Sequence, residues 1–84
     1  MTKTIKLLNK VFQTYDLGCA AGLLSEHFKL LKLDKTNIKR VLFRFEYESG
    51  IEQAVADYFS GNFQVDAQAY FNHIKSLKNR IYSD

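Results

Sequence analysis

The fold is decided by one stretch of the sequence, Lys39-Arg40-Val41-Leu42-Phe43-Arg44-Phe45-Glu46-Tyr47-Glu48. Apolar and aromatic residues recur there at every second position, and charged residues fill most of the positions between them. Because successive side chains of a β-strand point to opposite faces of a sheet, this alternation predicts a strand with one apolar face. We expect it to be the central strand of a small sheet, with Phe43 and Phe45 turned toward covering helices.

Two upstream stretches complete the predicted sheet. Residues 28–34 are mostly apolar and lead into the polar turn Asp34-Lys35-Thr36-Asn37, which predicts a hairpin with the central strand. Residues 10–15 contain several β-favouring side chains and predict the first strand. The sequence therefore supplies three strands, and the one richest in aromatic residues comes last.

A short helix is expected between the first two strands. Asp16 fits its N-cap, because an aspartate side chain can accept a hydrogen bond from a backbone N–H of the first turn. The helix is expected to run from Leu17 to a position near His27. Gly18 and Gly22 each weaken it by roughly 1 kcal/mol relative to alanine, and their lack of bulk lets the helix lie close to the sheet.

Two further helices are expected after the central strand. Ser49 and Glu52 have the spacing of a capping box, which predicts a helix that starts at Ser49. Gly61 is expected to end this helix in a left-handed turn, and Asp66 to cap the last helix. Apolar residues at helical spacing predict the buried sides: Ile51, Val55, Tyr58 and Phe59 in one helix, and Tyr70, Phe71, Ile74, Leu77 and Ile81 in the other.

The predicted order of elements is β-α-β-β-α-α, in an α+β fold. A helix that joins two strands of one sheet normally makes them parallel, and the hairpin makes the third strand antiparallel to the second. We therefore expect a three-stranded mixed sheet in the order 1-3-2, with the helices packed on one face. The length predicts a single small domain over residues 1–84, with residues 1–9 either a flexible arm or an extension of the first strand.

Several fragments of the chain resemble a known family. They are Thr14-Tyr15-Asp16-Leu17 with Ala20-Ala21, Phe43-x-Phe45, Tyr58-Phe59-x-Gly61 with Val65-Asp66, and Leu77-Lys78-x-x-Ile81-Tyr82. Together they resemble a family of short uncharacterised bacterial domains that is classified as a domain of unknown function. The resemblance implies a small cytoplasmic protein of a bacterium, a phage or a mobile element, and it brings no catalytic residue.

Composition and cysteine usage predict a cytoplasmic globular protein. The chain is 46% hydrophobic and 14% aromatic, which is typical of a chain with a folded core. No run approaches the roughly 18 apolar residues of a membrane span, and no signal peptide is apparent, so no membrane partner is expected. The single cysteine, Cys19, cannot form an internal disulfide, as expected in a reducing compartment.

The sequence contains no pattern typical of an active site. Cys19, His27 and His73 lack the paired spacing of metal ligands. Glu46 and Glu48 could form a carboxylate pair, but they are expected on a solvated strand face beside Arg44. We therefore expect no catalytic residue, metal, cofactor or small-molecule substrate, and no enzyme activity.

The charged residues are grouped in blocks along the chain, although the net charge is only +3. Residues 29–44 contain six basic side chains and one acid, whereas residues 45–66 contain five acids and no base. A basic hairpin can contact phosphates, so a small nucleic-acid-binding regulatory protein is one hypothesis. Its candidate contacts are Lys32, Lys35, Lys39, Arg40 and Arg44.

Protein–protein interaction or self-association is the favoured hypothesis. Helices on one face of the sheet would leave the other face uncovered, with Leu42, Leu31 and Leu33 as candidate interface residues. A three-stranded sheet also has two free edges, which can pair with another chain or another copy. The sequence therefore predicts a non-enzymatic accessory domain with a protein partner or a homo-oligomeric state, and it leaves a monomer as the alternative.

Overall fold

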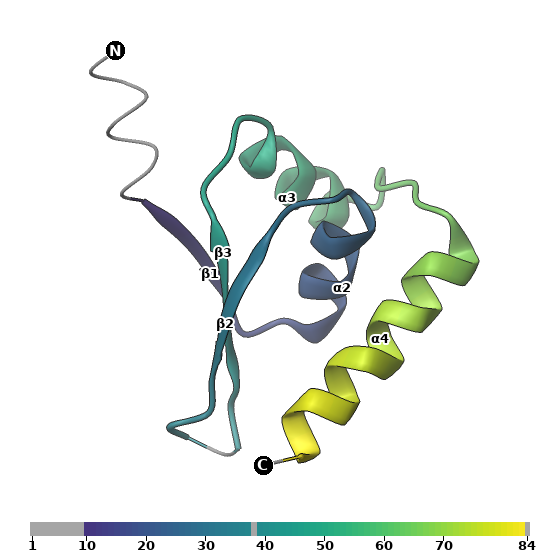
Figure 1. The fold of residues 1–84 in the computed structure, drawn as a ribbon. Coiled ribbons are helices and arrows are strands. Elements are labelled where there is room, and N and C mark those ends of the chain that lie inside the picture. Colours follow the sequence, from purple (N-terminus) through teal and green to yellow (C-terminus); the bar gives the residue numbers. More distant parts are fainter. Residues whose placement is uncertain (1–9, 38, 84) are drawn as a thin grey trace.

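The fold is an α+β arrangement in the expected order β-α-β-β-α-α (Figure 1). This computed structural model describes residues 10–37 and 39–83, so the expectation for residues 1–9 lies outside the described part of the chain. The elements are β1 (Val11–Thr14), α2 (Leu17–Ser25), β2 (Leu30–Asp34), β3 (Leu42–Glu46), α3 (Ile51–Ser60) and α4 (Ala67–Tyr82).

The sheet has the predicted strand order, β1-β3-β2, with β3 at its centre. In the register, Phe45 lies between Phe12 of β1 and Leu30 of β2. Both ladders are antiparallel, so the expectation of a mixed sheet is wrong. The crossover does make β1 and β2 run in the same direction, but β3 separates them, and no parallel ladder forms.

Helix α2 forms a layer between the sheet and α4 (Figure 1). It is buried along most of its length, from Cys19 to Leu23. A helix with neighbours on two sides needs small residues, and this segment contains two alanines, a cysteine and a glycine. At Gly22, a Cβ atom would come within 2.8 Å of the Phe63 ring. The small side chains therefore allow the sheet and α4 to pack on opposite sides of one helix.

The predicted aromatic core is confirmed at β3. Phe43 and Phe45 are 1% and 0% exposed, and the side chains of Leu23, Ile51 and Leu77 are also fully buried. Two aromatic residues that periodicity assigned to buried helix faces are instead in solvent, with Phe59 62% and Phe71 57% exposed. Both lie at the margin of their apolar stripes, where a small rotation of the helix decides between burial and exposure.

Two of the three predicted N-caps are confirmed. Asp16 Oδ1 accepts a hydrogen bond from the backbone N–H of Cys19 at 2.8 Å, and Asp66 caps α4 in the same way. The capping box at Ser49 is wrong, because Gly50 holds the N-cap position of α3 with a φ of 92° and makes no side-chain cap. Glu52 instead accepts a hydrogen bond from the Tyr47 hydroxyl.

Helices α2 and α3 end in the same hydrogen-bonded turn but use different residues for it. After α2, the N–H of Phe28 donates to Leu23 O and the N–H of His27 to Leu24 O. After α3, the N–H groups of Asn62 and Gly61 make the same pattern of bonds to Asp57 and Tyr58. This is the Schellman motif, which needs a left-handed residue just beyond the helix. Gly61 provides it at a φ of 84°, as predicted, whereas His27 adopts a φ of 71° despite its side chain.

Replacing His27 with glycine is expected to stabilise the domain by about 1 kcal/mol. A left-handed conformation costs a residue with a side chain roughly 1–2 kcal/mol, and glycine avoids this cost. Part of the gain is lost, because glycine loses more conformational entropy on folding. The free energy of unfolding can be measured by urea titration. Gly61→Ala is the matched control at the equivalent position of α3, and it should destabilise the domain. An unchanged or lower stability for His27→Gly would contradict this account of the turn.

Candidate functional site

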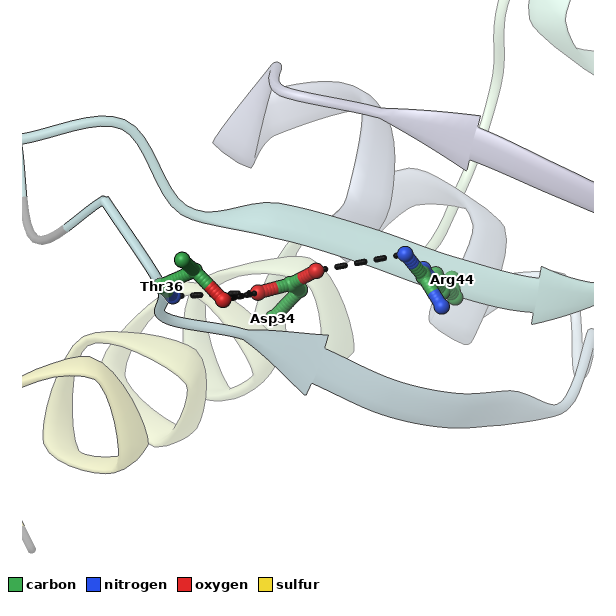
Figure 2. A network of polar contacts seen from close by, with 3 residues as sticks. All are labelled: Asp34, Thr36 and Arg44. Atoms are coloured by element: carbon green, nitrogen blue, oxygen red, sulfur yellow. Dashed lines mark hydrogen bonds and ion pairs between the residues drawn. The ribbon is translucent and has the colours of Figure 1, made fainter.

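The face of the sheet that no helix of the described residues covers (the uncovered face) contains an ion pair (Figure 2). Arg44 Nη2 lies 3.2 Å from Asp34 Oδ2, and Asp34 Oδ1 accepts hydrogen bonds from the hydroxyl and the backbone N–H of Thr36. These hydrogen bonds from Thr36 hold the pKa of the Asp34 carboxyl below its ordinary value, and the Arg44 charge acts in the same direction. Asp34 therefore fixes the hairpin turn and partly neutralises Arg44.

The candidate leucines do not form one surface. Leu42 is half-buried in β3, and Leu31 is exposed in β2, where the register shifts between Leu30 and Lys32 as at a β-bulge. Leu33 pairs with Phe43 in the ladder, so it shares the helix-covered face and packs against the core. The expectation that Leu33 lines an open interface is wrong, because this register could not be read from the sequence.

The five basic candidates are also divided among different surroundings. Lys35 Nζ donates to the carbonyl oxygens of Arg80 and Ser83, 2.9 and 2.7 Å away, at the C-terminal end of α4. Arg44 is paired with Asp34, and Lys32 is exposed beside it on β2. Lys39 and Arg40 lie beyond the hairpin turn and are exposed. The hairpin therefore does not present these residues as one continuous basic surface.

Lys39 and Arg40 line a cleft that has a volume of about 500 Å³. It lies where the chain after the hairpin turn meets the start of α2 and the end of α4. Tyr15 and Tyr82 also line it, and the Arg40 guanidinium carbon lies 4.0 Å from the centre of the Tyr15 ring. Sequence reasoning missed both tyrosines, because residues from opposite ends of the chain meet only in the folded domain.

The edge of the sheet at β1 is regular and has outward-facing backbone groups. The N–H of Tyr47 donates to the carbonyl of Lys10 at 3.3 Å. Residues of an antiparallel ladder alternately direct their backbone groups toward the neighbouring strand and away from it. The backbone groups of Phe12 therefore face β3, and those of Val11 and Gln13 face away from the sheet. In the sheet formed by the described residues, β1 has β3 as its single neighbour.

The opposite edge, at β2, is less suited to pairing. Its register shift lies between Leu30 and Lys32, at the start of the strand. A bulge and a lysine are both features by which proteins prevent edge strands from pairing with other chains. The side chain of Lys35, just beyond the strand, extends to the end of α4. Of the two edges that the sequence predicted, β1 is therefore the better suited to pairing.

A partly buried polar cluster joins the three helices. The Tyr58 hydroxyl of α3 donates to Asp16 Oδ1 at 3.3 Å, and the Tyr70 hydroxyl of α4 donates to the carbonyl of Gly18 at 3.2 Å. Burial raises the pKa of the Cys19 thiol to about 11, and the Asp16 carboxylate adds to the rise. Burial likewise raises the pKa of the Tyr58 phenol. Both groups are therefore neutral at physiological pH, which favours a structural role over nucleophilic chemistry.

Gly18→Ala is expected to destabilise the domain by about 1–3 kcal/mol. A Cβ atom at Gly18 would clash with the Tyr58 hydroxyl and lie 3.1 Å from the Tyr70 hydroxyl. This crowding should outweigh the roughly 1 kcal/mol that alanine gains over glycine in a helix. Tyr58→Phe removes the clashing oxygen, so the same Gly18→Ala change should cost less in that background. Equal costs in the two backgrounds, measured by urea unfolding, would contradict the predicted contact.

Within residues 10–37 and 39–83, no three His, Cys, Asp or Glu side chains lie in a group that could hold a metal ion. In the same part of the chain, no helix is both long enough and apolar enough to span a membrane.

The fold and its surfaces define a small α+β domain with an antiparallel three-stranded sheet covered by helices on one face. A family model described as Domain of unknown function (DUF5659) matches residues 9–83, and the chain belongs to this family. The resemblance to a domain of unknown function is therefore confirmed. Searches of curated proteins and of solved structures give no match to the chain.

Proposed function

We propose that the domain is a non-enzymatic protein-interaction module that pairs its β1 edge with an extended segment of another polypeptide chain. The observation that carries this proposal is the regular edge at Val11–Thr14, which has β3 as its single neighbour among the described strands and whose outward backbone groups can continue the ladder. Main-chain hydrogen bonds supply affinity in this mode of recognition, and alternate side chains supply specificity. The irregular β2 edge supports β1 as the strand that is used.

The exposed side chains of β1 support the same proposal. Val11 is 46% exposed and Tyr15, just beyond the strand, is 49% exposed. Gln13 lies opposite Arg44 on the uncovered face, and the alternation of the strand places Val11 and Tyr15 on the same face. A paired strand would place its own side chains beside these apolar groups. We further propose a cytoplasmic location, because the single cysteine is free and buried, as expected in a reducing compartment.

Gln13→Pro is the variant that tests edge pairing. Proline removes the outward N–H of Gln13 and leaves the β1–β3 hydrogen bonds intact, since those are made by alternate residues. Gln13→Ala is the matched control, because it removes the side chain and keeps the N–H. Peptides selected for binding from a random extended-peptide library should bind the wild type and Gln13→Ala but lose binding to Gln13→Pro. Binding that is equal for all three proteins would contradict edge pairing.

Nucleic-acid binding is the second candidate function, and the cleft beside Lys39 and Arg40 supports it. Both cations are exposed there, and Tyr82, which is 84% exposed, adds an aromatic ring on which a base could stack. Lys39→Glu with Arg40→Glu should then abolish binding in a gel-shift titration. Affinity for duplex DNA should fall with salt, with a logarithmic slope of about −0.9 per phosphate contact. Strong binding that this double variant removes would favour this candidate over edge pairing.

A further inference from the structure

We infer that the segment paired with β1 is the β1 strand of a second copy, in antiparallel orientation, with Gln13 on the two-fold axis. This inference rests on the proposed function and makes it specific. A two-fold interface requires a surface that is complementary to itself. The residues around Gln13 have this property both in their backbone groups and in their side chains.

The backbone of β1 restricts where the axis can lie. Val11 and Gln13 direct their N–H and C=O groups outward, and the same alternation places those of Tyr15 outward. The chain is again extended at Asp16, with φ −85° and ψ 113°. If the two-fold axis lies at Gln13, Gln13 of one protomer forms a hydrogen-bonded pair with Gln13 of its partner. Val11 of one protomer then forms a second such pair with Tyr15 of its partner.

Side chains on the uncovered face favour the axis at Gln13 over its neighbours. With this axis, the half-exposed Val11 lies opposite the half-exposed Tyr15 of the other copy, twice by symmetry. Pairs of an aromatic and a β-branched residue stabilise antiparallel strands. An axis at Phe12 would place Val11 opposite Gln13, and an axis at Thr14 would place Phe12 opposite Asp16. Neither alternative pairs the exposed apolar side chains with each other.

Charges on the helix-covered side support the same register. An axis at Gln13 places Lys10 of one copy opposite Asp16 of the other. The Lys10 amine lies 5.2 Å from the centre of the Tyr47 ring, and Asp16 points toward Tyr58, so both side chains lie on the same face of the sheet. The hydrogen bonds from Cys19 and Tyr58 both end on Oδ1 of Asp16, which leaves Oδ2 as the oxygen to receive Lys10.

The size of the contact predicts a weak dimer. A pair of edge strands as short as Val11–Thr14 buries less than the roughly 1,200 Å² of a stable protein–protein interface. The dimer should therefore dissociate on dilution, and sedimentation must cover a wide concentration series. The two sheets would join into one continuous antiparallel sheet across the axis, in which both β1 edges are covered.

Cross-linking tests the register directly. Residues that form a hydrogen-bonded pair have Cα atoms about 5.5 Å apart, within the range that a disulfide spans. Gln13→Cys should therefore form a covalent dimer on mild oxidation. Val11→Cys should not form a covalent dimer. The two residues at position 11 lie four residues apart along the paired strands, a distance of about 13 Å. The unchanged chain is the background control, since Cys19 is 1% exposed. Dimers from Val11→Cys but not from Gln13→Cys would overturn the register.

Sedimentation of charge and backbone variants separates this inference from the proposed function. Gln13→Pro and Lys10→Glu should each shift the dimer to monomer, and Lys75→Glu, at an exposed position of α4, should leave it unchanged. A monomer at all concentrations, without cross-linking at Gln13→Cys, would overturn the inference. The proposed function would still stand if library peptides bind and Gln13→Pro abolishes their binding, and it would fall if they do not. A dimer that is unaffected by Gln13→Pro would also overturn the inference.

Discussion

Phe45→Ala is expected to remove about 3–5 kcal/mol from the free energy of unfolding. Phe45 is 0% exposed in the central strand, and its ladder partners Phe12 and Leu30 pack against the same core. Alanine would leave a cavity that these neighbours cannot fill without moving the sheet. Because small domains have total stabilities at the low end of roughly 5–15 kcal/mol, the variant should be largely unfolded near physiological temperature.

Thermal and urea unfolding followed by circular dichroism measure this loss. Phe71→Ala is the matched control, because it makes the same chemical change at a position that is 57% exposed on α4. Substitutions at such surface positions usually change stability by less than about 0.5 kcal/mol. A Phe45→Ala protein that melts at the wild-type temperature would contradict the central position of β3 in the core.

Removal of the chain from Tyr70 onward is expected to prevent cooperative folding. This truncation deletes most of α4, which packs along α2 on the side away from the sheet (Figure 1). It removes the buried Leu77 side chain and the hydrogen bond from Tyr70 to Gly18. The apolar residues of α2 would then face water, because the sheet can cover one side of that helix only. We expect an insoluble chain, or a soluble chain without a cooperative melt.

A point substitution separates packing from chain length. Leu77→Ala keeps the full chain and should cost about 2–5 kcal/mol, because the side chain is fully buried. Lys78→Ala, at the next and exposed position, should change stability by less than about 0.5 kcal/mol. A truncated chain that retains a cooperative melt would show that α4 is dispensable, and equal effects of the two point changes would show that Leu77 is not packed.

The sequence predicted the features that depend on local chemistry. Alternation along residues 39–48 identified the central strand, and the order β1-β3-β2 followed from one crossover and one hairpin. Asp16 and Asp66 were predicted as caps, because a cap is made within a single helical turn. Leu33 was placed on the wrong face, since the register shift in β2 depends on contacts between strands.

The features that sequence reasoning missed depend on residues that are distant in the chain. Lys35 is a candidate nucleic-acid contact in the sequence, but its amine donates to carbonyl oxygens at the C-terminal end of α4. The cleft is lined by Tyr15 and Tyr82, which lie near opposite ends of the described chain. Sequence reasoning did predict free strand edges, and the structure adds which of the two is regular. Local sequence patterns carry no information about such contacts between distant residues, which depend on the packing of α4 on α2.

The separation of β1 from β3 along the chain has a consequence for the order in which the domain assembles. Strands β2 and β3 are joined by a short turn, whereas β1 reaches β3 only after α2, β2 and the turn have been traversed. Contacts between distant parts of a chain form late, because closing a long loop costs entropy before the contacts repay it. We expect β1 to dock last, over a preformed hairpin. In a φ-value experiment, Leu33→Ala should therefore slow folding more, relative to its loss of stability, than Phe12→Ala.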